Sequence, residues 1–272
     1  MPLISVIVAV YNGAPTLQQC LDSVSGQSYA RTQLIVVDGA SKDGSAKIIE
    51  SNQHKIDYRV SEPDRGIYDA WNKGLAQARG DWICFIGSDD YLWDSSVLQT
   101  MAEQLVRVPV GIRVVYGQIM LLDSQGRELH AIGKPWNQIQ ARFKELMCLP
   151  HPAVMHRQDL FAQHGNFDAS FRIAGDYDLL LRELKQNDAL FLPEIVVTAM
   201  RQGGISSNPG NNLKALREVR SAQLKNGLHK PGWAWRLAMA RSYVSFAMAQ
   251  VLGVKLTRAV LNAVKAVLAW FK

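Results

Sequence analysis

Four short runs of β-branched and other apolar residues alternate with segments of helical period up to about residue 105, and this alternation limits the possible folds most strongly. The runs are residues 4–10, 33–37, 57–61 and 82–86. Parallel strands need a crossover connection of about a dozen residues, which the intervening segments can supply. The pattern therefore predicts stacked β-α units around a parallel sheet, with helices of about ten to fifteen residues that begin near Pro15, Ser45 and Gly66.

Turn-forming and acidic residues follow each run. In an open α/β sheet, ligands bind at the carboxyl ends of the strands, so these turns are expected to lie along one edge. The acidic residues in or just after them are Asp38, Asp43, Asp64, Asp69, Asp89 and Asp90. Carboxylates repel a bare diphosphate, so such a cluster at a nucleotide-binding edge indicates a hard divalent cation, Mn²⁺ or Mg²⁺, between them and the phosphates. No G-x-G-x-x-G follows the first strand, and no G-x-x-x-x-G-K-[ST] occurs, which excludes two common phosphate-binding loops.

The pattern becomes mixed after residue 105. The expected elements are strands at 112–122 and 189–198, a Pro-His-Pro loop at 150–152 and a helix at 176–185. They indicate an α+β continuation of the first sheet that supplies a second wall to a cleft. The stretch 203–210, rich in Gly and Ser, is the clearest breaker in the chain. We therefore divide the chain into residues 1–105, 106–210 and 211–272.

The charge is distributed unevenly over these parts. The 272 residues include 30 Lys and Arg against 24 Asp and Glu, a net charge of +6. Residues 211–272 carry eleven basic side chains and Glu218 as the sole acid, a net charge of +10, whereas residues 1–210 carry 19 basic and 23 acidic side chains, a net charge of −4. The basic character therefore belongs to the tail.

Cysteine usage and the first residues bear on the compartment. Cys20, Cys84 and Cys148 are scattered and form no C-x-x-C pair, which excludes a disulfide framework and predicts a reducing compartment. The apolar start has no basic n-region and no small-residue cleavage site, so it is read as a first strand and not as a signal peptide.

Five motifs follow one another over about residues 3–207. They are SVIVAVYNG, LIVVDGASKDGS, EPDRGIYDAWNKGLAQARGDWICFIGSDDYLW, PHPAVMHR and FRIAGDYDLLLREL. In this order they resemble the family 2 inverting glycosyltransferases of the GT-A fold, which use nucleotide-diphosphate sugars. The resemblance implies an α/β fold with a Rossmann-like, mostly parallel mixed sheet flanked by helices, here with a C-terminal amphipathic helical extension. It also implies that residues 1–105 form the nucleotide-sugar-binding half and residues 106–210 the acceptor-binding half.

Tyr11 and Asp38 are the candidate base-binding residues. Tyr11 follows the first strand, where an aromatic ring can stack on a pyrimidine base, and by resemblance it packs against uracil or a similar base, with a UDP-sugar as the expected donor. By resemblance Asp38 accepts a hydrogen bond from the base edge. The alternative for Asp38 and Asp43 is that short polar side chains satisfy the backbone of a turn. We favour the ligand role for Asp38 and the turn role for Asp43.

Ser88-Asp89-Asp90 corresponds to the family's metal motif, often written D-x-D. By resemblance Asp90 binds the cation that bridges the two phosphates, and Asp89 contacts the ribose or a metal-bound water. The cation offsets charge on the departing nucleotide diphosphate. The alternative is that the two carboxylates cap the next helix. Many relatives carry a metal-binding His near the end of the catalytic domain, but residues 200–206 contain none, so Gln202 or water would take its place.

Arg65 and Asp69 are secondary candidates at the start of the third helix. Arg65 can clamp the diphosphate, because a guanidinium group matches phosphate oxygens. Asp69 and Asn72 lie three residues apart on one helix face, and by resemblance this helix start closes over the donor. The competing interpretation is a surface ion pair between Arg65 and a nearby acid.

Asp176 is the candidate catalytic base. Inverting transfer is a single in-line displacement, so one carboxylate must take the proton of the acceptor hydroxyl as it attacks. The family usually places this base in a Glu-Asp pair at the start of a late helix, and here Gly175 replaces the Glu. The alternative is an acidic residue favoured by the helix dipole alone. By resemblance His151 lines the acceptor side, against an equally weighted structural role.

The tail resembles a membrane-surface helix. No uncharged stretch in residues 233–272 reaches the roughly 18 to 20 residues of a transmembrane helix. At 100° per residue, the polar positions share an arc of about 100° opposite an apolar face; they are Lys255, Arg258, Asn262, Lys265 and Lys272. Basic and aromatic residues in this arrangement suit anionic headgroups and the acyl boundary. The alternative is a helix packed on the catalytic domain or in a homo-oligomer.

Together these features predict a cytoplasmic enzyme that is peripheral on the inner face of the plasma membrane and glycosylates a saccharide on a polyprenyl diphosphate carrier, in bacterial surface polysaccharide assembly. One rival, a sugar-phosphate nucleotidyltransferase, usually has a Gly-rich basic loop after the first strand, which YNGAPTL lacks. A nucleic-acid-binding tail would interleave basic with polar residues, and this tail is too apolar. Asp90 and Asp176 argue against a non-catalytic membrane scaffold.

Overall fold

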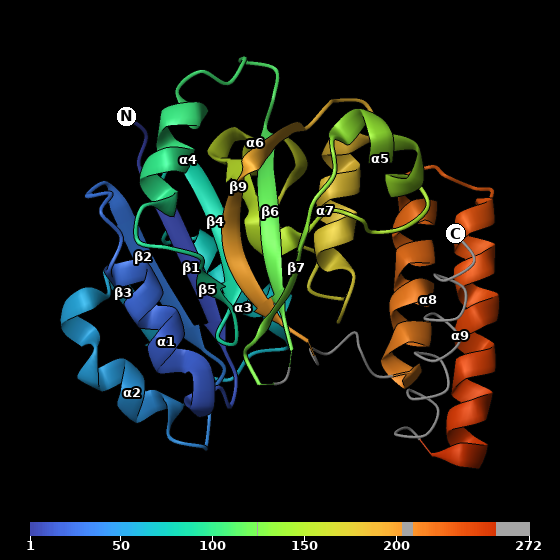
Figure 1. Cartoon of the computed structure of the whole chain (residues 1–272), viewed down its shortest axis with the longest axis horizontal. Helices are drawn as coiled ribbons and strands as arrows, with labels where there is room; N and C mark the ends of the chain where they lie inside the picture. The colour runs from blue at the N-terminus through green and yellow to red at the C-terminus, as the bar shows by residue number, and fades with distance from the viewer. Residues whose placement is uncertain (124, 203–208, 254–272) are drawn as a thin grey trace.

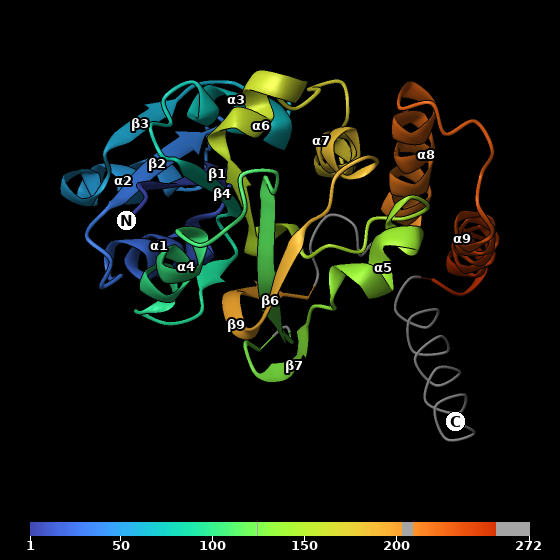
Figure 2. The ribbon, with the colours of Figure 1, turned by 90° about the horizontal axis from the view of Figure 1, so that it is seen from above.

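The chain folds around one mixed β-sheet that carries helices on both faces (Figures 1 and 2). The structure, a computed structural model, describes residues 1–272 except 124, 203–208 and 254–272. In this part of the chain the strands are β1 (Ile4–Val10), β2 (Thr32–Asp38), β3 (Tyr58–Ser61), β4 (Trp82–Gly87), β5 (Tyr91–Leu92), β6 (Val114–Leu122), β7 (Glu128–Ile132), β8 (Val154–Arg157) and β9 (Leu190–Arg201). The helices are α1 (Ala14–Ser25), α2 (Ser45–Ser51), α3 (Ile67–Leu75), α4 (Val97–Leu105), α5 (Trp136–Phe143), α6 (Gln158–His164), α7 (Gly175–Leu184), α8 (Pro209–Lys225) and α9 (Trp233–Leu252), with 3₁₀ turns at Gln53–Lys55 and His151–Ala153.

The first half of the sheet is parallel, as the alternating pattern predicts. Strand order is β3-β2-β1-β4-β8-β6-β9-β5, and β7 pairs with β6. β1 pairs in parallel with β2 and β4, and all its residues are buried, because helices cover both faces of this half. Strand order reverses direction between β1 and β4, and open α/β sheets bind ligands outside the carboxyl ends of the strands at such a point. The predicted α/β fold class is confirmed.

The first helices begin where the sequence predicts, but two of them are shorter than expected. α1 has 12 residues, α2 has 7 and α3 has 9. α2 ends at Ser51, and the side-chain amide of the next residue, Asn52, donates to the carbonyl of Ile48 and to the side chain of Gln18 on α1, both at 2.9 Å. The chain then continues in the 3₁₀ turn instead of a further helical turn. The expected length of about ten to fifteen residues was wrong for α2 and α3.

The second half of the sheet is mixed. β8 runs antiparallel to β4 and β6, and β9 runs parallel to β6. β6, β9 and α7 correspond to the strands predicted at 112–122 and 189–198 and to the helix predicted at 176–185. β5, β7 and β8 were not predicted, because β5 and β8 have two and four residues and β7 is exposed along most of its length. None of them shows the buried-exposed alternation that identifies a strand.

Two apolar clusters cover the two faces of the sheet. Alternate residues of one strand enter different clusters, as the pleat requires. Ile7 of β1 belongs to the cluster that contains Trp71 of α3 and Tyr177 of α7, whereas Val8 belongs to the cluster that contains Leu17 of α1 and Met101 of α4. The larger aromatic residues gather on the side of α3, α6 and α7. This face therefore supports both the third helix and the helix that carries Asp176.

α8 and α9 stand beside α7 at one side of the molecule (Figures 1 and 2). α8 packs against α7, and α9 packs against α8. Leu213, Val219 and Ala222 on α8 are buried, so this helix adds to the core of the preceding residues. The division at residue 210 remains a prediction, and α8 is in close contact with the part that precedes it.

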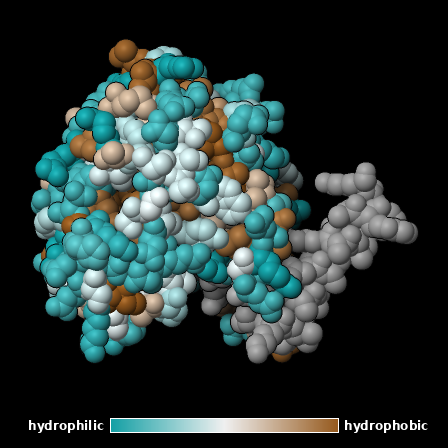
Figure 3. Space-filling view, turned by 60° about the vertical axis from the view of Figure 1, so that its left-hand side comes forward, coloured by the Kyte–Doolittle hydropathy of each residue, from teal (hydrophilic) through white to brown (hydrophobic). Residues whose placement is uncertain are grey.

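The predicted amphipathic helix at 255–272 lies outside the described residues. α9 carries apolar residues around its circumference instead of on one face, and it exposes Trp233, Tyr243 and Val244. Among the helices that the structure describes, none is long and apolar enough to cross a membrane. The face seen in Figure 3 is mostly hydrophilic, with apolar side chains scattered over it.

Candidate active site

A cleft of about 940 Å³ opens at the carboxyl ends of β1, β2 and β4. The ends of β1 and β4 approach closely there, since a Cβ atom on Gly13 would lie 2.3 Å from the Oγ of Ser88. The residues that line the cleft come from these strand ends, from the start of α3, from the loop before α7 and from α8. They include Tyr11, Lys42, Asp64, Arg65, Asp89, Arg172 and Lys214. Tyr11, Arg65 and Asp89 of this set are site residues predicted from the sequence, and Asp64 belongs to the predicted acidic cluster at the strand ends.

Tyr11 projects from the end of β1 with 70% of its surface exposed. A Cβ atom on Gly39, at the end of β2, would lie 3.2 Å from the Tyr11 ring and 2.3 Å from a carboxylate oxygen of Asp64. Glycine at this position therefore leaves room for Tyr11 and Asp64 beside the same point of the cleft. The exposed ring is available for stacking on a planar ligand.

Asp38 lies fully buried at the end of β2. Its carboxylate accepts hydrogen bonds from the Ser41 N–H at 3.2 Å and from the Ser61 hydroxyl at 2.5 Å, and the Ser41 hydroxyl also donates to it. These contacts fix the turn after β2. The predicted contact of Asp38 with a base edge stays a prediction.

Asp43 holds the same region together from the next turn. Its carboxylate accepts the Ala14 N–H at the start of α1 at 2.9 Å and the Ser45 hydroxyl at 2.7 Å. It therefore links the turn after β2 to the helix after β1. This is the turn role that the sequence analysis favours for Asp43.

Asp89 and Asp90 follow β4 and lie in different environments. Asp89 is exposed and lines the cleft, whereas Asp90 is 8% exposed and accepts the Gly87 N–H at 3.3 Å. Burial, together with the neighbouring charge of Asp89, raises the pKa of Asp90 to about 8. The pair is therefore a carboxylate at the surface of the cleft with a second carboxyl group buried behind it.

This pair fits a divalent cation that is shared with a substrate. A buried carboxyl group next to a carboxylate is destabilised in its charged form, and a cation would relieve that cost. In the part of the chain that the structure describes, no group of three or more His, Cys, Asp or Glu side chains could hold a metal ion alone. Mg²⁺ in particular is commonly held by one or two carboxylates and by substrate phosphates. Asp90 stays the predicted ligand, and Asp89 is the carboxylate that lines the cleft.

Arg65 and Asp69 form an ion pair at the start of α3. The Arg65 guanidinium lies 3.2 Å from the Asp69 carboxylate, and the Arg65 N–H donates to the same side chain at 3.0 Å. Burial raises the pKa of Asp69, but the hydrogen bonds and charge of Arg65 outweigh it and the net pKa is lowered. The Arg65 side chain is 76% exposed on the cleft. The structure thus contains the predicted competing ion pair and leaves Arg65 at the cleft wall.

Asp176 lies in the first turn of α7, directly after the loop that forms part of the cleft wall. The Tyr68 hydroxyl donates to its carboxylate at 3.1 Å, and the Tyr177 N–H donates at 2.8 Å. Burial raises the pKa of Asp176 to about 6, against the opposing effect of these two hydrogen bonds. A carboxylate with this pKa is mostly ionised at pH 7 and can accept a proton.

Gly175 leaves the space that Tyr68 occupies. A Cβ atom at position 175 would lie 2.8 Å from the Tyr68 ring. The family's Glu at this position is therefore incompatible with Tyr68 in its present place. The replacement of the family's Glu by Gly175 therefore has a physical reason. The Tyr68 ring packs against the backbone just before Asp176.

His151 lies beneath the site and not on a cleft wall. It is 6% exposed, and its ring lies 5.0 Å from that of Trp71 and 6.1 Å from that of Phe85. Burial lowers the pKa of His151 to about 3, so the ring is neutral. Of the two equally weighted interpretations of His151, the structure favours the structural role, because the ring is buried in the aromatic core.

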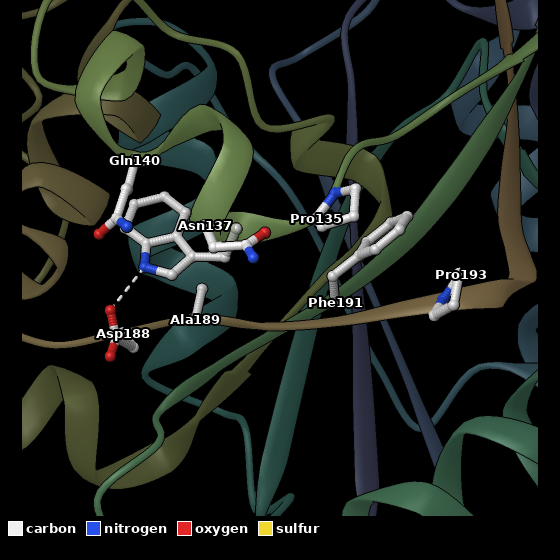
Figure 4. Close-up of a pocket in the computed structure, with 8 residues that line it drawn as sticks. Pro135, Asn137, Gln140, Asp188, Ala189, Phe191 and Pro193 are labelled. Atoms are coloured by element: carbon white, nitrogen blue, oxygen red, sulfur yellow. Dashed lines mark hydrogen bonds between the residues drawn. The ribbon is translucent and has the colours of Figure 1, made fainter.

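A second pocket, of about 490 Å³, lies near the start of β9 (Figure 4). The Trp136 indole N–H donates to Asp188 there at 2.8 Å. β9 runs parallel to β6 and β6 runs in the direction of β4, so the start of β9 lies at the edge of the sheet opposite the cleft. None of the predicted site residues lines this second pocket.

Sequence reasoning did not assign roles to Tyr68, Arg172 or Lys214. Tyr68 lies inside a recognised motif, but its contact with Asp176 joins residues 108 positions apart. Lys214 belongs to the tail by composition, yet it lines the cleft. Because the net charge changes sign near residue 211, Lys214 was grouped with the tail and not with the cleft.

Comparison with known proteins found relatives in sequence and solved structures of similar fold. A glycosyltransferase of Mycobacterium tuberculosis named for PGL/p-HBAD biosynthesis is 29% identical over 212 residues, which are 76% of this chain and 80% of the relative. A mannosyltransferase structure from Pyrobaculum calidifontis, with GDP-Man and Mn²⁺, is similar with a TM-score of 0.64 and 18% identity, covering 100% of this chain and 81% of that one. Residues 1–349 of S. aureus TarS, with UDP-GlcNAc, give a TM-score of 0.62 and 18% identity, covering 80% and 66%. The chain covers 39% of the longer TarS structure.

These structures share the GT-A type of fold with the present chain, which confirms the fold that the motifs imply. Residues 5–163 match the family described as Glycosyl transferase family 2. This match includes the strand ends that carry Tyr11, Asp38, Asp89 and Asp90. The chain belongs to glycosyl transferase family 2.

Proposed function

We propose that this glycosyltransferase moves a sugar from a nucleotide-diphosphate donor, with a UDP-sugar as the first candidate, to a saccharide acceptor with inversion at the anomeric carbon. One observation carries the proposal: a single cleft at the reversal point of the sheet brings Tyr11 and Asp89 into the same space as the loop that leads to Asp176. This transfer needs a ring that stacks on the nucleotide base, a carboxylate that holds a cation and a general base for the acceptor.

The donor would lie across the ends of β1, β2 and β4. Tyr11 would stack on the base, and the basic side chains of the cleft wall suit a diphosphate; they are Lys42, Arg65, Arg172 and Lys214. The TarS structure that holds UDP-GlcNAc and the mannosyltransferase structure that holds GDP-Man and Mn²⁺ share this fold, which supports a nucleotide-sugar at this edge.

Asp89 and Asp90 would hold a Mn²⁺ or Mg²⁺ cation, which offsets the negative charge on the leaving nucleotide diphosphate. Asp176 would accept the proton of the acceptor hydroxyl while that oxygen bonds to the anomeric carbon and the bond to the diphosphate breaks. Tyr68 and the Tyr177 N–H hold one oxygen of Asp176 and leave the other for the acceptor. One displacement with one base inverts the anomeric configuration.

The acceptor would be a saccharide on a polyprenyl diphosphate carrier at the inner face of the plasma membrane, in surface polysaccharide assembly. The exposed apolar residues of α9 and the net charge of +10 in residues 211–272 support contact with an anionic lipid surface. α8 joins this segment to the cleft, because it carries Lys214 in the wall and packs against α7.

A donor screen tests the proposal. The full chain is incubated with UDP-, GDP- and dTDP-sugars and Mn²⁺ or Mg²⁺, and release of nucleotide diphosphate and thermal shift are measured. We expect release from one class of donor that EDTA abolishes. Release of inorganic pyrophosphate from a nucleoside triphosphate and a sugar phosphate would instead indicate a nucleotidyltransferase. No product with any donor and a lipid-linked acceptor would contradict the proposal.

A further inference from the structure

The sole acidic residue of the segment 211–272 makes an unusual contact with the catalytic half of the chain. One carboxylate oxygen of Glu218, on α8, accepts three successive main-chain N–H groups. The distances are 3.0 Å to Arg172, 2.7 Å to Ile173 and 3.0 Å to Ala174. The oxygen therefore binds the last three residues of the loop that precedes α7.

This contact lies immediately before the first turn of α7. The N-cap of α7 is Ala174, and its side chain makes no cap hydrogen bond. The three N–H groups that Glu218 binds precede those of the helix itself, which begins at Gly175. Glu218 supplies a carboxylate from 44 residues away, and a negative charge is favourable at this end of the helix dipole. The hydrogen bonds are charge-assisted and hence strong.

Glu218 is itself held by a rigid element. Leu213, Val219 and Ala222 on the same helix are all buried in the core. α8 therefore cannot shift without breaking buried contacts. One carboxylate oxygen of Glu218 attaches residues 172–174 to this fixed helix.

The loop bears directly on the site. Arg172 and Ile173 line the cleft, and Asp176 follows Ala174 by two residues. A displacement of the loop would move the carboxylate of Asp176 relative to the cleft, and misplacement of a reacting group by about 1 Å can cost about 10²-fold in rate.

We propose that Glu218 is a positioning residue for Asp176, through which the basic C-terminal segment completes the active site. The proposal rests on the proposed function, in which Asp176 is the base. It follows that α8 contributes to the active site, because the carboxylate of Glu218 determines the geometry of the loop before α7.

The test compares Glu218→Gln and Glu218→Ala with Gln223→Ala as a matched control. Gln223→Ala removes buried hydrogen bonds of the same helix but leaves the contact with residues 172–174. For each variant, the unfolding temperature, the dissociation constant of the donor nucleotide, kcat and KM are measured on the full chain below the unfolding temperature. Hydrogen exchange of the amides of Arg172, Ile173 and Ala174 reports the loop directly.

We expect Glu218→Gln to lower kcat by about tenfold and Glu218→Ala by about 10²-fold, with KM for the donor changed less than about twofold. Exchange at the three amides should rise in the same order. Gln223→Ala should lower the unfolding temperature and leave kcat close to that of the wild type.

Wild-type kcat in folded Glu218→Ala, or an equal loss of kcat in Gln223→Ala at the same temperature, would overturn the positioning role. Failure of the proposed function has another signature, since the wild-type chain would then release no nucleotide diphosphate from any donor. If exchange at residues 172–174 is faster in Glu218→Ala but kcat is unchanged, Glu218 holds the loop without positioning Asp176. That result would also overturn the proposal.

Discussion

The hydroxyl of Tyr68 on α3 donates a 3.1 Å hydrogen bond to the carboxylate of Asp176 on α7, across 108 residues of chain. The contact joins residues 1–105 to the part of the chain that carries the candidate base. It also explains a departure from the family pattern, because the ring of Tyr68 takes the space beside Gly175. The carboxylate of Asp176 is thus held by a residue of α3.

The pH dependence of transfer should change when Tyr68 is replaced by Phe. Burial raises the pKa of Asp176 to about 6, and the bond from Tyr68 acts in the opposite direction. A base must be ionised, so kcat of the wild type should fall tenfold per pH unit below about 6. Tyr68→Phe removes a stabilising bond to the carboxylate, so the acid limb should move to higher pH and kcat should fall at pH 6.

Tyr177→Phe is the matched control for this comparison. It removes the hydroxyl that donates to the Lys144 carbonyl at 3.2 Å and leaves the Tyr177 N–H on Asp176. Its acid limb should coincide with that of the wild type. An acid limb near pH 4 in the wild type, the ordinary range of an Asp, or no shift in Tyr68→Phe, would contradict the environment described for Asp176.

Gly175→Ala should destabilise the protein and slow transfer. The new methyl group would lie 2.8 Å from the Tyr68 ring, and overpacking of this kind costs about 1–3 kcal/mol. Displacement of the ring would also disturb the bond to Asp176. Gly111→Ala is the control, since a Cβ atom there would meet no atom within 4 Å. Equal unfolding free energies for both variants in urea would refute the packing argument.

Asp90→Asn should remove the metal-dependent part of donor binding and leave the fold intact. Burial and Asp89 raise the pKa of Asp90 to about 8, so an uncharged amide suits this buried position. We expect an unfolding temperature at least equal to that of the wild type, with donor affinity at saturating Mn²⁺ reduced tenfold or more. Unchanged affinity in Asp90→Asn, measured by calorimetry with and without Mn²⁺, would remove Asp90 from the set of metal ligands.

The C-terminal segment should bind anionic membranes. The full chain is expected to sediment with vesicles that contain anionic lipid and to remain in solution with neutral ones, because lysine and arginine near a surface gain about 1 kcal/mol each from anionic headgroups. The double variant Arg236→Glu/Arg241→Glu, at exposed positions of α9, should weaken this binding. A wild-type chain that stays in the supernatant with anionic vesicles would refute the membrane role.

Much of the structure of residues 1–105 could be predicted from the sequence, because it depends on local patterns. Buried strands with β-branched residues and turns after them predict β1 to β4 and bring Tyr11 and Asp89 to one edge. The contacts of Tyr68 and Glu218 could not be predicted, since each depends on helices packed across the tertiary structure. His151 shows the same limit, because a loop position in the sequence gave no sign of the aromatic core around it.

Asp176→Asn tests the central claim most directly. The substitution keeps the size of the side chain and removes the ability to accept a proton, so transfer to the acceptor should fall by at least about 10²-fold. Donor binding in the presence of Mn²⁺, measured by calorimetry on the same preparation, should change less than about twofold, since Asp176 is assigned to the acceptor. Transfer at the wild-type rate by a folded Asp176→Asn protein would contradict the assignment of Asp176 as the catalytic base.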